Sequence, residues 1–176
     1  MRYLGIYLAD IFGLCVLINT FFKKTKDNTM QTLPHHYNVQ ATGQPDSNVQ
    51  VYAKNLADLT LAPPSQFGGP GDQWSPEDLF MASVASCFIL SFKAIARASN
   101  LSWLSVECDV QGELDKMEGK TQFTNIVIKA KLVISPSQDS EKAQRLLIKA
   151  DQSCLVSNSV KAGTDLECEV IVHQQS

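Results

Sequence analysis

The residues best suited to chemistry in this sequence are two cysteines in different local settings. Cys87 lies within a long apolar segment, residues 75–98, that is typical of a buried helix. Cys154 lies at residues 151–157, where a second, amphipathic segment ends. A thiol beside a second thiol can attack an oxidant, become oxidised and be rescued as a disulfide. Redox chemistry between these two cysteines is therefore the leading hypothesis, and simple packing of Cys87 inside the helix is the alternative.

The other three cysteines have less promising surroundings. Cys108 and Cys168 fall in phase with the apolar residues of strand-like segments, as small core residues do, and Cys15 belongs to an N-terminal apolar segment. The sequence has no C-x-x-C pair, and its three histidines are not at metal-ligand spacing from any cysteine pair. We therefore expect no metal and no cofactor. Five free thiols in a chain that does not need disulfides indicate a reducing cytoplasm.

Composition narrows the class of protein. With 176 residues, the chain is long enough for one domain with a core of its own. Hydrophobic residues make up 44% and charged residues 19%, which is ordinary for a soluble globular protein. The net charge is -3 and there is no basic stripe, so nucleic acid is not an expected partner.

The N-terminus leaves two interpretations open. Residues 3–22 are nearly all apolar and are followed by three lysines, a pattern that fits a membrane anchor with the domain in the cytoplasm. The alternative is an upstream extension, with Met30 as the working start of the domain. In both cases residues 1–29 precede a domain at residues 30–176.

The start of the apolar helix is the clearest local signal. Ser75 suits the N-cap position and Pro76 the first helical position, while Glu77 and Asp78 complement the positive end of the helix. Apolar and small residues then cover almost every face up to Ala98, so we expect a helix buried on all sides.

The remaining segments either alternate apolar and polar residues or show helical spacing. They predict strands at 37–41, 49–53 and 58–61, the helix at 75–98, strands at 106–111 and 123–132, a helix at 140–151 and a strand at 166–172. This order predicts an α+β fold with antiparallel hairpins and a long central helix.

The sequence around the two cysteines resembles the OsmC / organic hydroperoxide resistance (Ohr) family. Residues 74–88 (WSPEDLFMASVASCF) are similar to that family's signature helix, and residues 150–157 (ADQSCLVS) to its second-cysteine segment. The order of elements matches from about Met30 to Val172. The resemblance implies an OsmC-like fold with antiparallel sheets around the central helix. It also implies an intertwined homodimer with active sites at the interface.

The resemblance further implies a thiol peroxidase with an antioxidant role in stress response. It assigns to Cys87 the attack on the distal oxygen of an organic hydroperoxide, which releases the alcohol. The sulfenic acid then condenses with Cys154, and a dithiol or lipoyl reductant reopens the disulfide. Glu77 matches the family's glutamate that orients a catalytic arginine. The apolar surroundings favour fatty or aromatic hydroperoxides over hydrogen peroxide.

Two features depart from the family pattern. The family's thiolate is usually paired with an arginine, but no arginine occurs between Met30 and Ala96, and Gln66 stands near one place where some members have it. Leu155 replaces the proline that often follows the resolving cysteine. These departures leave open a second hypothesis, a non-catalytic redox-sensing or ligand-binding protein on the same scaffold.

Helix geometry also limits the role of Glu77. Ten residues separate it from Cys87, which is about 15 Å of rise in a straight helix. Glu77 can therefore join the site only if the helix breaks or if it reaches across a dimer. Its alternative role is to stabilise the N-terminus of its own helix.

Overall fold

The computed structural model describes residues 31–173. The predicted extension or anchor at residues 1–29, which includes Cys15, lies outside the described residues. Residues 31–38 belong to a unit distinct from residues 39–173. They contain no helix or strand, and all of them are exposed.

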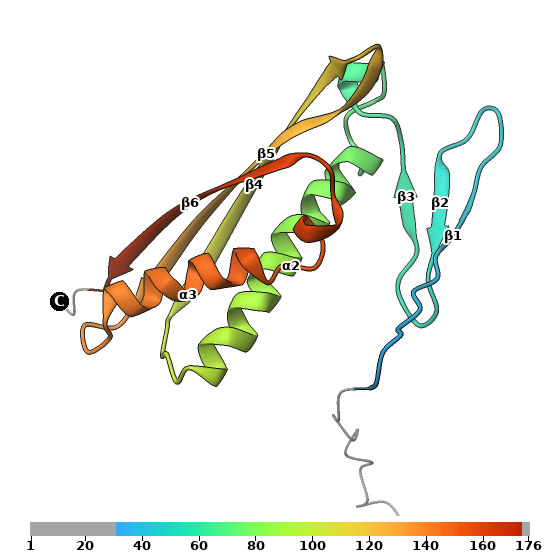
Figure 1. The fold of residues 1–176 in the computed structure, drawn as a ribbon. Coiled ribbons are helices and arrows are strands. Elements are labelled where there is room, and N and C mark those ends of the chain that lie inside the picture. Colours follow the sequence, from blue (N-terminus) through green and yellow to red (C-terminus); the bar gives the residue numbers. More distant parts are fainter. Residues whose placement is uncertain (1–30, 174–176) are drawn as a thin grey trace, which may run out of the picture. The chain divides into compact units, whose positions relative to one another are not determined.

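Two three-stranded sheets form within residues 39–173 (Figure 1). The first contains β1 (Gln40–Thr42), β2 (Val49–Tyr52) and β3 (Leu59–Leu61), which pair in antiparallel fashion in the order of the sequence. All three strands were predicted, although β1 begins later than expected. Only Leu61 of these strands is buried, so this sheet leaves most of its side chains exposed.

The second sheet contains β4 (Ser105–Met117), β5 (Lys120–Ile134) and β6 (Gly163–Val172) in that order. The predicted hairpin of β4 and β5 is confirmed, and both strands run on to a tight turn at Glu118 and Gly119. Both turn residues have positive φ, 49° and 81°, as two-residue hairpin turns require. The predicted antiparallel pairing does not extend to β6, which is parallel to β5. A helix between β5 and β6 returns the chain to the starting end of the sheet, so the two strands run in the same direction.

Two helices cover one face of the β4–β6 sheet (Figure 1). The first, α2, spans Pro76–Ala98, as the start signals predicted. The Ser75 hydroxyl accepts the Asp78 N–H at 3.0 Å, and the Asp78 carboxylate accepts the Ser75 N–H at 3.1 Å, which makes a reciprocal capping box. The second, α3, spans Ser140–Gln152 and is capped by Asp139.

The hydrophobic core lies between these helices and the sheet. From α2 it takes a stripe of every fourth residue, and β5 and α3 supply most of the rest. The fully buried side chains include Val84, Phe88, Phe92, Ala96, Ile126, Ile128, Leu132, Ile134, Ala143, Leu147 and Ala150.

Only one side of α2 is covered within residues 39–173. The sequence predicted a helix buried on all sides, yet Leu90 is 63% exposed. The reason is that the sheet and α3 both pack against the same side of the helix. By length and apolar composition α2 could cross a membrane, but the core helix of a soluble protein meets the same criteria.

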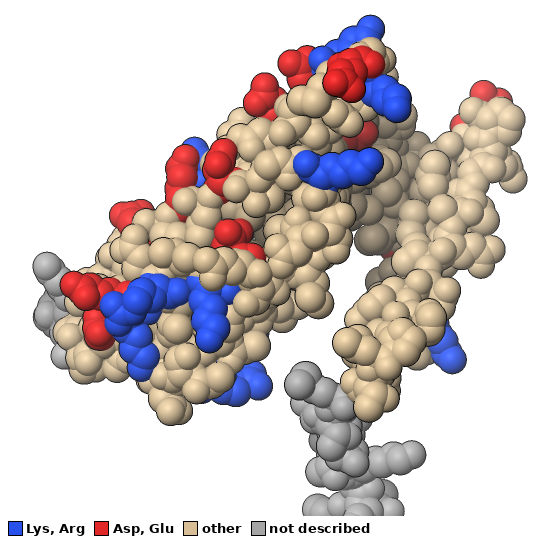
Figure 2. Space-filling view, viewed as in Figure 1, with Lys and Arg blue, Asp and Glu red and all other residues tan. Residues whose placement is uncertain are grey.

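Charged side chains of both signs lie together on the surface seen in Figure 2. The ion pairs join Lys129 to Glu167 at 3.8 Å, and Arg145 to Asp139 at 3.9 Å and to Glu141 at 3.6 Å. All of these side chains are largely exposed to solvent, and such pairs contribute about 0–1 kcal/mol each. The stability of the fold therefore comes mainly from the apolar core.

Candidate functional site

The structure brings Cys87 and Cys154 together. Cys87 lies midway along α2, and Cys154 lies two residues after the end of α3, which packs against α2. Each thiol affects the pKa of the other, which places the two side chains near each other, and both are free thiols. Cys154 is fully buried, whereas Cys87 is half-buried and can be reached from solvent. Two segments that are 67 positions apart thus form one dithiol site.

Hydrogen bonds favour the charged form of Cys87. Burial raises the pKa of this thiol, but hydrogen bonds from the Val156 N–H and from Cys154 lower it. The Leu155 N–H and the Ser91 hydroxyl act in the same direction. The net result is a pKa for Cys87 below its usual value. Thiolate is the reactive form of cysteine, so Cys87 is the more reactive sulfur of the pair.

Cys154 has the opposite tendency. Burial raises its pKa, hydrogen bonds from Ser157 lower it in part, and the neighbouring Cys87 raises it again. The Ser157 hydroxyl donates to the Cys154 sulfur at 3.2 Å. With its pKa raised above the ordinary value, Cys154 keeps its proton at neutral pH. Such a pair can carry out attack at one sulfur and disulfide closure from the other.

Cys108 and Cys168 are not activated. Both are half-buried and pack against the core, as expected from their phase in the strands. Burial, with smaller contributions from Asp109 and Cys154, raises the pKa of Cys108 to about 11. Burial and Asp151 raise the pKa of Cys168. Both thiols are protonated and unreactive at neutral pH.

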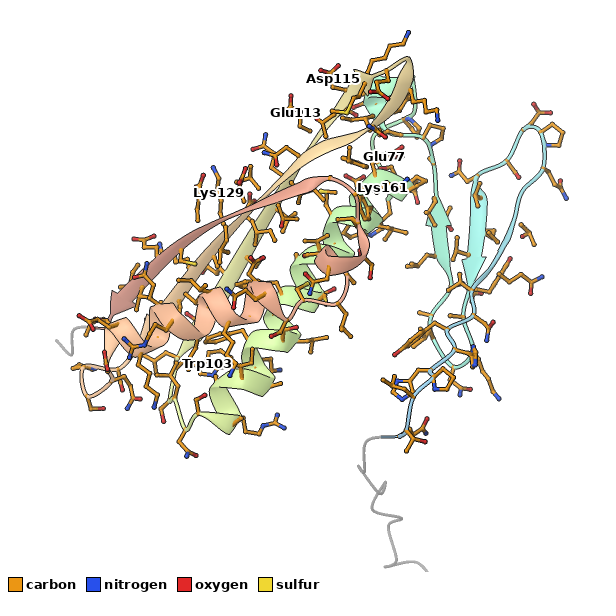
Figure 3. All side chains as sticks on the ribbon, viewed as in Figure 1. Glu77, Trp103, Glu113, Asp115, Lys129 and Lys161 are labelled. Atoms are coloured by element: carbon orange, nitrogen blue, oxygen red, sulfur yellow. The ribbon has the colours of Figure 1, made fainter. Side chains whose placement is uncertain are left out.

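Glu77 is not brought to Cys87 within the chain. Since α2 continues without a break from Pro76 to Ala98, the rise between the two residues is about 15 Å. Figure 3 shows Glu77 on the first turn of α2, toward the end of the β4–β5 hairpin that carries Glu113 and Asp115. The structure therefore separates this candidate residue from the dithiol.

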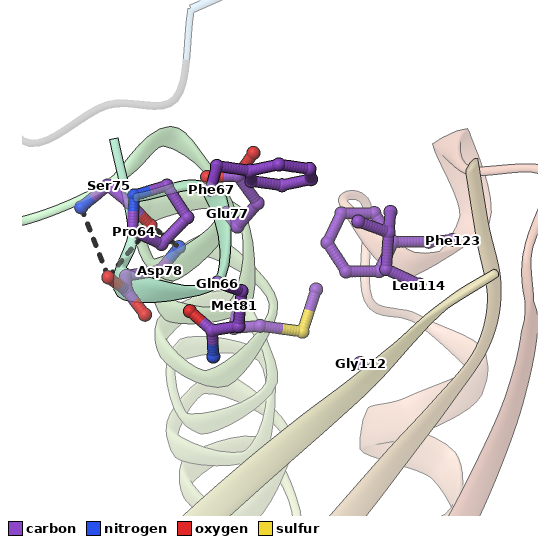
Figure 4. Close-up of a pocket in the computed structure, with 10 residues that line it drawn as sticks. All are labelled: Pro64, Gln66, Phe67, Ser75, Glu77, Asp78, Met81, Gly112, Leu114 and Phe123. Atoms are coloured by element: carbon purple, nitrogen blue, oxygen red, sulfur yellow. Dashed lines mark hydrogen bonds between the residues drawn. The ribbon is translucent and has the colours of Figure 1, made fainter. Parts of the chain in front are cut away.

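Glu77 instead lines a pocket of about 200 Å³ (Figure 4). Its Oε2 atom is buried and has no hydrogen-bond partner among the described residues. The pocket lies between the loop before α2, the first turns of α2 and the β4–β5 hairpin. It is lined by Pro64, Gln66, Phe67, Ser75, Glu77, Asp78, Met81, Gly112, Leu114 and Phe123. This lining includes Gln66, the residue near one family arginine position, but no lysine or arginine.

The sequence analysis did not identify four residues that affect the two thiols. Ser91 follows Cys87 by one helical turn, so helical spacing could have identified it. Ser157 and the backbone amides of Leu155 and Val156 carried no comparable signal, because their positions depend on how the chain turns after Cys154. Within residues 31–173, no group of three or more His, Cys, Asp or Glu side chains is placed to hold a metal ion.

Comparisons with known proteins agree with this fold. Residues 69–169 match the family described as OsmC-like protein. The organic hydroperoxide resistance protein of Xanthomonas axonopodis pv. citri is 32% identical over 122 residues, which cover 66% of this chain and 80% of that protein. An organic hydroperoxide resistance protein OsmC from Legionella pneumophila matches with a TM-score of 0.64 and 26% identity, over 80% of this chain and all of that one. An OsmC-like protein of unknown function from Vibrio cholerae shares the fold, with a TM-score of 0.72 and 19% identity over 77% of this chain and all of that one.

Proposed function

The chain belongs to the OsmC-like protein family, and from this membership and the dithiol site we propose that it is a cysteine-based thiol peroxidase that reduces organic hydroperoxides to alcohols. The observation that carries the proposal is the contact between Cys87 and Cys154, in which the accessible sulfur ionises more readily than the buried one. This asymmetry suits Cys87 to the attacking role and Cys154 to the resolving role.

The proposed reaction has three steps. The Cys87 thiolate attacks the distal oxygen of the hydroperoxide, the O–O bond breaks, and the leaving alkoxide takes a proton to become the alcohol. The Cys154 sulfur then attacks the Cys87 sulfenic acid; its proton and the departing hydroxide form water, and a disulfide results. A dithiol or lipoyl reductant, itself oxidised to a disulfide, returns both cysteines to thiols. No cofactor is required in this scheme.

The surroundings of Cys87 favour an organic substrate. Leu90 lies three residues further along α2 and is 63% exposed, and Leu155, the residue after Cys154, is 75% exposed. Apolar side chains beside the reactive sulfur can bury an alkyl or aryl group, which hydrogen peroxide lacks. We therefore expect fatty or aromatic hydroperoxides to be better substrates than hydrogen peroxide.

The proposal is tested by mixing reduced protein with cumene hydroperoxide and following thiols and alcohol together. We expect two thiols to disappear for each cumyl alcohol formed, and repeated turnover when a dithiol is supplied. Hydrogen peroxide at the same concentration should react more slowly. Loss of thiols over hours without matching alcohol would contradict a peroxidase and support redox sensing.

A non-catalytic redox-sensing or ligand-binding role is the second candidate, and Glu77 favours it. A buried carboxylate oxygen without a partner, in a pocket whose lining has no basic side chain, differs from a site in which an arginine activates the thiol. The pocket offers a place for a small ligand instead. The cumene hydroperoxide experiment distinguishes this candidate from the first.

We also propose that the protein is a cytoplasmic homodimer in which a second copy covers the open side of α2. Besides Leu90, the β1–β3 region exposes several large apolar side chains, and apolar surface of this kind is typical of a protein interface. They are Val39, Val49, Tyr52, Leu56 and Leu59.

Replacing Leu90 by glutamate should weaken this dimer, because the substitution places a charge in the proposed apolar interface. In size-exclusion chromatography with light scattering at micromolar concentration, we expect the unaltered protein at about twice the chain mass of 19.4 kDa. The Leu90→Glu variant should shift toward the single chain, while Lys149→Glu, at an exposed position of α3, should not. A monomeric unaltered protein would refute the dimer.

A further inference from the structure

Glu77 has a buried carboxylate oxygen that the described part of the chain leaves without a partner. Its Oε2 atom makes no hydrogen bond within residues 31–173, and the ion pairs of this part of the chain join other residues. A buried charged group is normally paired or hydrogen-bonded, because its removal from water is costly. We therefore expect a partner for this oxygen from outside residues 31–173.

The neighbouring Asp78 shows what a satisfied carboxylate looks like at the same place. Its Oδ2 atom accepts the Ser75 N–H at 3.1 Å and the Ser75 hydroxyl at 2.8 Å. Both acids lie in the first turn of α2, where the positive end of the helix favours negative charge. An exposed carboxylate would have this effect as well, so the helix end does not explain why the Glu77 oxygen is buried.

Glu77 borders two pockets that offer room for such a partner. The smaller has a volume of about 200 Å³ and the larger about 420 Å³, and Pro64 and Phe67 also line both of them. Neither lining contains a lysine or an arginine, and Glu77 is the only charged residue in the lining of the larger pocket. The carboxylate thus borders open space that is otherwise mainly apolar.

The wall of the smaller pocket is a close apolar contact between α2 and the β4–β5 hairpin. Met81 extends from α2 toward Phe123 of β5, beside Gly112 of β4 (Figure 4). A Cβ atom at Gly112 would lie 2.6 Å from the Met81 sulfur and 2.8 Å from the Phe123 ring, so only glycine allows this approach. Aromatic faces attract cations, and thioethers pack well against aromatic rings.

These features identify the class of ligand. An anion would be repelled by Glu77 and Asp78. A metal ion needs several ligands, but within residues 31–173 no group of three or more His, Cys, Asp or Glu side chains is placed to hold one. An amidinium or guanidinium group fits these walls, because it is flat, donates two parallel N–H bonds to a carboxylate and stacks on aromatic faces.

We propose that the smaller pocket binds a small organic cation whose amidinium or guanidinium group pairs with the Glu77 carboxylate. The apolar part of this ligand packs against Phe67, Met81 and Phe123. The inference names the ligand class for the ligand-binding candidate and rests on that candidate for its biological meaning. Within one chain the pocket is remote from the dithiol, with about 15 Å of rise along α2 between Glu77 and Cys87.

The test measures binding of benzamidine to the full-length protein by isothermal titration calorimetry. Benzamide is the matched control ligand, because it has nearly the same shape but no charge. We expect saturable binding of benzamidine and at least about tenfold weaker binding of benzamide. Equal affinity for the two ligands, or no binding of benzamidine up to about 10 mM, would overturn the inference. The second result is expected if a basic side chain of a second copy occupies the pocket.

Two variants locate the bound cation. Glu77→Gln keeps the size of the side chain and removes its charge, and it should bind benzamidine at least about tenfold more weakly. Glu141→Gln removes an exposed acid from the first turn of α3 and should bind as the unaltered protein does. Unchanged affinity in Glu77→Gln would refute the site. The comparison of benzamidine with benzamide needs no variant, so it remains decisive should Glu77→Gln not fold.

The binding result and the peroxidase result are independent of each other. Failure to bind benzamidine overturns the inference but leaves turnover of cumene hydroperoxide, and with it the peroxidase proposal, as measured. A protein that binds benzamidine through Glu77 but does not reduce cumene hydroperoxide supports the inference and removes the peroxidase.

Discussion

Replacement of Cys87 by serine is expected to reduce hydroperoxide turnover to the rate measured without protein. A serine hydroxyl is not ionised near neutral pH, and it cannot form the sulfenic acid on which the disulfide depends. The buried Cys154 does not take over, because burial and the proton it holds keep it from attacking a hydroperoxide from solvent. The measurement is the rate of cumyl alcohol formation in the presence of excess dithiol. Normal turnover by Cys87→Ser would show that the proposed mechanism is wrong.

Two matched variants separate the roles of the cysteines. Cys154→Ser should release one alcohol per chain and then stop, because the sulfenic acid has no resolving thiol; with more peroxide it should over-oxidise to the sulfinic acid, which intact mass detects. Cys168→Ser should turn over normally, since Cys168 is a core residue with a raised pKa. A loss of turnover in Cys168→Ser would mean that cysteine replacement in general damages the protein.

The elements that could be predicted from the sequence are those with local signals. Ser75 is the N-cap of α2, as its residue type predicted, and α2 starts and ends close to the predicted positions. The apolar spacing at residues 140–151 likewise identified α3. These signals depend on contacts within a few residues, so no knowledge of the rest of the fold was needed.

Pairing between distant segments could not be predicted in the same way. The alternation at residues 166–172 identified a strand, but not that this strand runs parallel to β5. The direction of the strand depends on where the chain leaves α3 relative to the sheet. Similarly, the apolar sequence of α2 does not distinguish burial within one chain from burial against a second copy. Leu90 and Phe92 both look like core residues in the sequence, yet Leu90 is 63% exposed and Phe92 is fully buried.

The same distinction applies to the candidate site: residues with a local sequence signal could be identified, and residues placed only by the fold could not. Cys87 and Cys154 could be named because cysteine is rare and because their surroundings resemble known motifs. Ser157, whose hydroxyl donates to the Cys154 sulfur at 3.2 Å, could not, since its position depends on how the chain turns after Cys154. Glu77 matched a family residue, but the unbroken α2 keeps it about 15 Å from Cys87 along the helix.

Phe92 links this helix to the core. Its side chain is fully buried, and its ring lies 5.7 Å from that of Trp103 at an interplanar angle of 63°, an edge-to-face arrangement. Phe92 also belongs to the stripe of α2 that faces the sheet and α3. The same packing holds Cys87, five residues earlier, against the end of α3.

Replacement of Phe92 by alanine is expected to lower the free energy of unfolding by about 3–5 kcal/mol. The change removes a large buried side chain, leaves a cavity and abolishes the aromatic contact with Trp103. Such a loss is a large part of the about 5–15 kcal/mol that stabilises a typical protein. Urea denaturation followed by fluorescence or circular dichroism, with all variants at one protein concentration, measures it. Gln144→Ala, at an exposed position of α3, should change the value by no more than about 0.5 kcal/mol. Equal effects of the two substitutions would contradict the placement of Phe92 in the core.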